Sequence, residues 1–135
     1  MFKQQPRLRI LIVDDIGDVR RDLRVLLQIA GNFEVVGEAA DGHGAIEQLA
    51  LLRPDVVVMD LSMPGLGGLQ AAPRMKAESP ECRVVALTVH SDEVSRQKAI
   101  AAGFDAFVVK GTPLPELLDA IAGNQSCPSP SGGAS

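Results

Sequence analysis

Five polar residues in this chain of 135 residues each follow a short apolar run, and their side chains could do chemistry together. They are Asp14, Asp15, Asp60, Thr88 and Lys110. Three carboxylates that share one site repel each other unless protons or a cation offset their charge. Oxygen ligands favour a hard cation, and Mg²⁺ is the candidate because it keeps several of its waters in a shallow site. A carboxylate can also act as a nucleophile, and the ammonium of Lys110 can pair with an anion there.

The apolar runs alternate with amphipathic stretches, and this pattern predicts the elements that position these residues. Runs rich in β-branched residues predict five strands, at residues 8–13, 33–39, 55–60, 83–88 and 104–110. The second run is the most polar, as expected at a sheet edge, and the third is apolar on both faces. Five βα units in succession predict an α/β fold, a doubly wound parallel (βα)5 sheet with flavodoxin-like strand order 2-1-3-4-5. Ligands bind at the carboxyl ends of the strands in such sheets, and the polar residues are expected there.

Capping residues predict where the intervening helices begin and end. Asp41 predicts an N-cap, and Gly103 predicts a C-terminus. Ser91 is expected to open the fourth helix, and Pro113 is expected at the first helical position of the fifth. Pro73 lies in the third helical stretch, so we expect that helix to start near residues 69–70, with Pro73 in its first turn, or to kink.

Four short motifs occur in the same order as in one known family. They are the pair Asp14-Asp15, the segment 60–68 (DLSMPGLGG), Thr88 after an apolar strand, and Ala102-Gly103 followed by Phe107 and Lys110. Each motif is weak alone, but all of them in this order and spacing resemble the receiver domain of a two-component response regulator, over residues 8–122. The resemblance implies a signalling switch that accepts a phosphoryl group from a histidine kinase or a phosphotransfer protein.

The resemblance also implies a role for each residue at the metal. Asp60 is the implied phospho-acceptor and contributes to the metal site. Asp15 is implied to bind Mg²⁺ directly, and Asp14 mostly through water. The backbone carbonyl of Ser62 is implied to complete the protein ligands.

Further residues are implied to handle the phosphoryl group. Thr88 would hydrogen-bond to it, Lys110 would form an ion pair with it, and Phe107 would act with Thr88 as the conformational switch. Phosphoryl transfer of this kind needs positioning and charge neutralisation rather than elaborate acid–base groups. The chain is therefore expected not to be a conventional enzyme, and to catalyse only its own phosphotransfer and slow dephosphorylation.

Two segments of the chain suggest how the receiver is used. Residues 31–39 resemble receivers that precede a LuxR-type helix-turn-helix output, which favours control of transcription, with DNA bound only through an output domain outside this chain. Residues 123–135 are rich in Pro, Ser and Gly and predict a flexible tail or linker after a receiver domain at residues 1–122. The alternative is a stand-alone receiver or phosphorelay intermediate without DNA-binding output. Phosphorylation is expected to promote a homodimer through a changed output face.

Two departures from the family pattern affect the expected rates. Gly111 follows Lys110, where many receivers have proline, and Val89 follows Thr88, where a small residue is usual. Val89 is expected to shield Asp60 from water and so prolong the life of the acyl phosphate.

Two other function classes stay open. An aspartyl phosphatase or phosphotransferase would typically show Asp-x-Asp after its first strand, whereas this chain has adjacent aspartates. A pseudo-receiver that binds partners without phosphorylation is disfavoured by the complete set of polar residues. Taken singly, each of these residues is most simply a solvated strand end, a turn residue or a surface lysine, so the inference depends on their joint occurrence.

Composition excludes several classes. A net charge of −4, 3% aromatic residues and no Trp or Tyr argue against a nucleic-acid-binding module. Two cysteines, Cys82 and Cys127, make neither a disulfide framework nor a zinc site, which favours a reducing, cytoplasmic compartment. No apolar run approaches the roughly 18 residues that a membrane helix needs. We therefore expect a cytoplasmic protein with no membrane contact.

Overall fold

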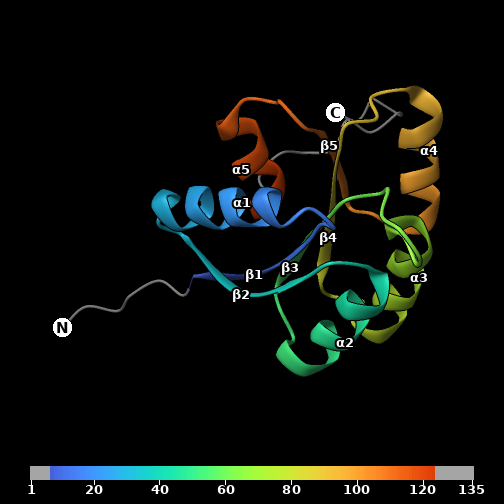
Figure 1. Cartoon of the computed structure of the whole chain (residues 1–135), viewed down its shortest axis with the longest axis horizontal. Helices are drawn as coiled ribbons and strands as arrows, with labels where there is room; N and C mark the ends of the chain where they lie inside the picture. Colours follow the sequence, from blue (N-terminus) through green and yellow to red (C-terminus); the bar gives the residue numbers. More distant parts are fainter. Residues whose placement is uncertain (1–6, 124–135) are drawn as a thin grey trace.

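The computed structural model describes residues 7–123, which form five parallel strands, each followed by a helix (Figure 1). The strands are β1 (Leu8–Val13), β2 (Phe33–Ala39), β3 (Val56–Met59), β4 (Arg83–Thr88) and β5 (Ala106–Val109). They lie in the order β2-β1-β3-β4-β5, and every neighbouring pair is parallel. The predicted doubly wound sheet and its strand order are confirmed, although β3 and β5 are shorter than predicted.

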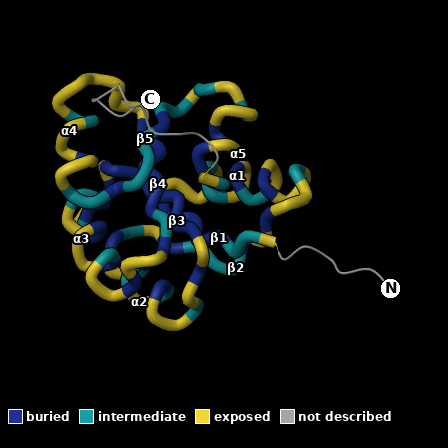
Figure 2. The backbone as a smooth tube through the Cα atoms, turned by 180° about the vertical axis from the view of Figure 1, so that it is seen from behind, coloured by how far each residue is buried: buried dark blue, intermediate teal, exposed yellow. Residues whose placement is uncertain are grey.

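Helices cover both faces of the sheet. They are α1 (Gly17–Ala30), α2 (Gly42–Leu52), α3 (Gly68–Glu78), α4 (Glu93–Ala102) and α5 (Leu114–Ala122). Successive side chains of a strand point to opposite faces. In β1, Ile10 and Ile12 therefore pack in a core with α1 and α5, whereas Leu11 and Val13 pack in a second core with α2, α3 and α4. Figure 2 shows the buried strands between helices whose outer surfaces are exposed.

Two helix ends follow the predicted caps. Asp41 caps α2, and Gly103 ends α4 with φ 103°. The prediction for Ser91 is wrong, because Asp92 is the N-cap of α4 and accepts a hydrogen bond from the backbone N–H of Ser95. A carboxylate in that position both satisfies an unpaired N–H group and places negative charge at the positive end of the helix.

Prolines in α3 and α5 lie close to their predicted positions, but not at them. α3 begins at Gly68, so Pro73 lies in its second turn rather than its first. A side chain at Gly68 would collide with the backbone carbonyl of Asp60, so the start of α3 lies directly against the end of β3. Pro113 is the N-cap of α5 and precedes its first helical residue, Leu114.

The predicted tail lies outside the described residues, apart from Gly123, which ends α5 with φ 81°. The domain boundary at residue 122 stays a prediction. Cys127 also lies outside the described part, whereas Cys82 is buried, and burial raises the pKa of its thiol to about 11. None of the helices within residues 7–123 has the length and apolarity needed to cross a membrane.

Candidate functional site

Three aspartates meet at the carboxyl ends of β1 and β3, which are neighbours in the sheet. One oxygen from each of Asp14, Asp15 and Asp60 lies within 4.8 Å of the others. Asp14 is 2% exposed and Asp60 is 8% exposed, whereas Asp15 faces solvent. The structure thus brings the three carboxylates together at one edge of the sheet, as predicted, and buries two of them.

Lys110 links the two buried aspartates. Although β4 lies between β3 and β5, the Nζ of Lys110 is 3.0 Å from Asp14 Oδ2 and 3.1 Å from Asp60 Oδ2. Burial alone would lower the pKa of the Lys110 ammonium, but the hydrogen bonds and charges of the two carboxylates outweigh burial and raise it. Lys110 therefore stays charged and offsets one of the three negative charges.

Backbone N–H groups hold the other oxygens of the buried pair. Ile16 donates to Asp14 Oδ1 at 2.9 Å, and Ser62 donates to Asp60 Oδ1 at 3.1 Å. Among the described residues, the carboxylate of Asp15 makes no hydrogen bond or ion pair. Three carboxylates and one ammonium leave two formal negative charges, so the cluster fits a divalent metal ion with oxygen ligands.

Thr88 joins this edge from the neighbouring strand β4. It is fully buried, and its Oγ1 accepts a hydrogen bond from the backbone N–H of His90 at 3.1 Å. The imidazole Nε2 of His90 lies 3.0 Å from the Ser62 hydroxyl. The loops that follow β3 and β4 are therefore joined beside Asp60, through a contact that the sequence does not predict.

The structure does not support the expectation that Val89 shields Asp60. The residue is 66% exposed, so most of its side chain faces solvent. Ser62 and His90 are also exposed, but their side chains contact each other and join the two loops next to Asp60, so we expect this contact to hinder water on this side.

The structure places two further residues that the sequence analysis singled out, one in β5 and one just after it. Phe107 is half-buried and packs against the core that α2, α3 and α4 cover, and its switch role stays a prediction. Gly111 has φ 98°, a conformation that proline cannot adopt because its ring holds φ near −65°. Glycine after Lys110 therefore permits a turn that the usual proline would exclude.

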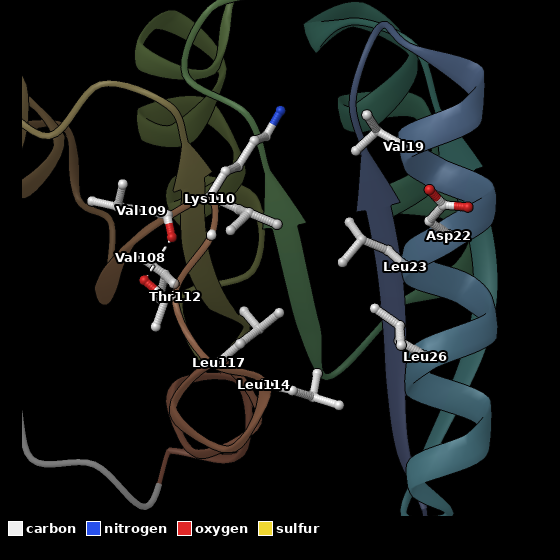
Figure 3. A pocket seen from close by; sticks show the side chains of 12 residues that line it. Val19, Asp22, Leu23, Leu26, Val108, Val109, Lys110, Thr112, Leu114 and Leu117 are labelled. Atoms are coloured by element: carbon white, nitrogen blue, oxygen red, sulfur yellow. Dashed lines mark hydrogen bonds between the residues drawn. The ribbon is translucent and has the colours of Figure 1, made fainter.

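An apolar groove of about 250 Å³ lies between α1 and the connection from β5 to α5 (Figure 3). Leu23 and Leu26 of α1 line one side, and Leu114 and Leu117 of α5 line the other. Lys110 stands at one end of the groove and its ammonium points away from these leucines, toward the aspartates. A partner seated in the groove would therefore lie beside the acidic site.

The sequence did not predict a cluster of three charged residues beside the site, Arg20, Arg24 and Glu38. Arg20 of α1 donates from Nη1 to the backbone carbonyl of Asp14 at 2.6 Å, and from Nε to Glu38 Oε1 at 3.0 Å. Arg24 donates to the second oxygen of Glu38 at 2.7 Å. Burial tends to raise the pKa of Glu38, but the hydrogen bonds from the two arginines outweigh burial and lower it. In the sequence, Arg20 and Arg24 lie one helical turn apart, and Glu38 lies late in β2. Nothing in this pattern predicts that the three side chains meet, because the contact forms only when α1 packs on β2.

Comparison with known proteins gives consistent matches. The family model described as "Response regulator receiver domain" matches residues 10–122. The chain is 36% identical over 114 residues to "Response regulator GacA" of Pseudomonas viridiflava, covering 84% of this chain and 53% of the relative. It is 35% identical over 114 residues to "Response regulator UvrY" of Escherichia coli, covering 84% and 52%. The chain thus spans about half the length of the curated relatives it matches.

Solved structures agree with these matches. A LuxR-family two-component response regulator from an Aurantimonas species aligns with a TM-score of 0.83 and 33% identity, covering 95% of this chain and 94% of that one. The signal receiver domain of the response regulator NarL from Mycobacterium tuberculosis aligns with a TM-score of 0.81 and 28% identity, covering 88% and 99%. The isolated receiver domain of RcsB from Salmonella enterica, determined with the phosphomimetic BeF3⁻, aligns with a TM-score of 0.79 and 25% identity, covering 90% and 92%.

Proposed function

The chain belongs to the family of response regulator receiver domains, and from that premise we propose that it is a phosphorylation-dependent switch with Asp60 as its acceptor. One observation carries the proposal. The carboxylate of Asp60 is almost fully buried, yet it lies within reach of both the solvent-facing Asp15 and the ammonium of Lys110. A nucleophilic carboxylate beside a metal-binding carboxylate and a fixed cation is the arrangement that phosphoryl transfer needs.

The transfer step follows from this arrangement. An oxygen of Asp60 forms a bond to phosphorus while the bond from phosphorus to the donor histidine nitrogen breaks, and that nitrogen leaves with the electron pair. We propose that the cluster binds Mg²⁺, held directly by Asp15 and Asp60, through water by Asp14, and by the carbonyl of Ser62. The ion supplies positive charge to the phosphoryl oxygens.

Lys110 and Thr88 handle the product. Lys110 already lies 3.1 Å from an Asp60 oxygen, so its ammonium can form an ion pair with a phosphoryl group attached there. The Oγ1 of Thr88 accepts a hydrogen bond from His90, which leaves its O–H to donate to a phosphoryl oxygen.

The partners and the output are proposed on the same basis. Response regulators work with histidine kinases, and a kinase or phosphotransfer protein must reach the edge where Asp60 lies, beside the groove between α1 and α5. Because the match covers only about half of each relative named as a response regulator, and a LuxR-family response regulator aligns with this chain, we propose that its output is transcription control through a separate DNA-binding domain. Phosphorylation then acts through Phe107 and promotes a homodimer. The proposed compartment is the cytoplasm, and the proposed chemistry is limited to self-phosphorylation and slow dephosphorylation.

Acceptor identity is tested with acetyl phosphate and Mg²⁺, followed by intact-mass analysis. The wild-type chain should gain one phosphoryl group, and Asp60→Asn should gain none. Asp18→Asn is the matched control, because Asp18 is an exposed aspartate of α1 outside the cluster. Labelling of Asp60→Asn at the wild-type level would overturn the proposal.

A further inference from the structure

The side chains of Arg20 in α1 and Glu38 in β2 form a charged bridge that reaches the backbone of Asp14. The guanidinium of Arg20 donates to the backbone carbonyl of Asp14 at 2.6 Å and to the carboxylate of Glu38 at 3.0 Å. The side chains of Arg20 and Glu38 are only 22% and 28% exposed, so this bridge is largely shielded from water. Charge-assisted hydrogen bonds in such a setting hold geometry more firmly than neutral ones.

The bridge completes a set of contacts around one residue. Asp14 donates its N–H to the carbonyl of Ala39 at 3.1 Å, and its side chain is held by Ile16 and Lys110. Arg20 holds the remaining polar group, the backbone carbonyl. Asp14 is therefore fixed through both its backbone and its side chain.

The carbonyl of Asp14 belongs to the peptide group that leads into Asp15. A peptide group is planar, so the direction of this carbonyl sets the placement of the next N–H and Cα. The carboxylate of Asp15 is exposed and makes no hydrogen bond or ion pair among the described residues, so its position depends on that backbone. We propose that Arg20 is a positioning residue that aims Asp15 at the divalent metal, with Glu38 holding the guanidinium in place. This inference depends on the proposed function, because it assumes that the acidic cluster binds Mg²⁺.

The charge and the geometry of Arg20 predict opposite effects, which makes the proposal testable. A positive charge next to a cation site opposes metal binding, so removing charge alone would strengthen the binding of Mg²⁺. Removing a positioning contact would weaken it, since groups that orient metal ligands typically contribute 10-fold or more in affinity. Arg24→Gln is the matched control: it removes the same charge and a contact to the same Glu38, but Arg24 does not contact Asp14.

The experiment is a titration of the ¹⁵N-labelled chain with MgCl₂, followed by amide NMR shifts, for wild type, Arg20→Gln, Arg20→Lys and Arg24→Gln. We expect Arg20→Gln to raise the dissociation constant for Mg²⁺ about 10-fold, with Arg20→Lys between it and wild type, and Arg24→Gln within about twofold of wild type. The amide of Asp15 should also shift in metal-free Arg20→Gln. When acetyl phosphate is the donor, Arg20→Gln should change the phosphorylation rate at saturating Mg²⁺ only slightly. It should change the Mg²⁺ concentration that gives half of this rate much more.

The titrations separate the role of Arg20 from the existence of the metal site. Equal or tighter Mg²⁺ binding by Arg20→Gln relative to Arg24→Gln would overturn the role of Arg20 while leaving the metal site intact. A wild-type chain that shows no saturable response to Mg²⁺ would instead overturn the metal site itself. If Arg20→Gln does not fold, Arg20→Lys decides, because it keeps the charge but not the two-pronged contact: several-fold weaker binding supports the proposal, and wild-type binding overturns it.

Discussion

The ammonium of Lys110 neutralises two buried carboxylates, so replacing it by methionine should destabilise the metal-free chain. Methionine keeps most of the apolar side-chain stem and removes the charge. Asp14 and Asp60, which are 2% and 8% exposed, would each lose a hydrogen bond from a cation and would repel each other. Breaking a buried ion pair by removing one partner costs about 3–5 kcal/mol. Because the Lys110 side chain is 22% exposed and water screens part of this interaction, we expect a loss of about 3 kcal/mol at neutral pH.

Thermal unfolding followed by circular dichroism measures this loss, since the chain has no Trp or Tyr to report by fluorescence. A loss of about 3 kcal/mol corresponds to a fall in Tm of roughly 10 °C for a domain of this size. Mg²⁺ should restore more stability to Lys110→Met than it adds to wild type, because the ion supplies the missing positive charge. Lys98→Met is the control, as Lys98 is exposed on α4. Equal Tm values and equal Mg²⁺ responses for wild type and Lys110→Met would refute the reasoning.

The pH dependence gives a second check on Lys110. Its pKa in the folded chain is raised above the ordinary lysine value of 10.5. The ammonium therefore contributes its full stability below that ordinary value, and the contribution fades as pH rises through the folded-state pKa. The stability difference between wild type and Lys110→Met should stay constant near neutral pH and narrow in strong alkali.

Four further substitutions test separate parts of the site. Asp15→Asn should abolish the saturable Mg²⁺ response, whereas the stability of the metal-free chain should hold or rise, because one of three like charges is gone. If the variant does not fold, Asp14 and Asp15 serve to hold the fold rather than to bind metal. Glu38→Gln should lower the free energy of unfolding by about 1 kcal/mol at pH 7. Since the pKa of Glu38 is lowered, that deficit should disappear as pH falls through the folded-state pKa, and parallel acid unfolding curves would contradict the ion-pair assignment. His90→Ala should shorten the phosphoryl half-life several-fold, equivalent to about 1 kcal/mol, and Val89→Ala should change it less than twofold. The measurement is the loss of phosphoryl signal after the donor is removed. A larger effect of Val89→Ala than of His90→Ala would show that Val89 is the barrier to water after all.

The sequence predicted the acidic edge because each residue there lies at the end of a strand. Strand ends are local features: the apolar run 8–13 stops where two aspartates begin, and the structure gives β1 the same bounds. The polar second run and the apolar third run then placed β1 beside β3, which is enough to bring Asp14 and Asp60 together. Neither step required knowledge of a side-chain conformation.

The contacts that the sequence did not predict join elements that pack together only in the folded chain. Arg20 reaches Glu38 because α1 lies on β2, and His90 reaches Ser62 because the loops after β3 and β4 converge. Even the misplaced start of α3 has this origin, since Gly68 lies against the backbone of Asp60. Such contacts depend on rotamers and on the distance between elements, which hydrophobic periodicity does not encode.

The position of Lys110 predicts which element would move if Asp60 is phosphorylated. A phosphoryl group on Asp60 would bring nearly two negative charges, and the ammonium of Lys110 is already in contact with Asp60. Lys110 directly follows β5, an edge strand of four residues of which only Val108 is buried, and its backbone N–H donates to the carbonyl of Thr88 at 2.7 Å. Every residue of β3 and every residue of β4 except Arg83 is buried, so these strands resist displacement, whereas β5 has a single neighbouring strand. A change in the partner of Lys110 should therefore displace β5 first, and with it Phe107 and the wall of the groove that α5 forms.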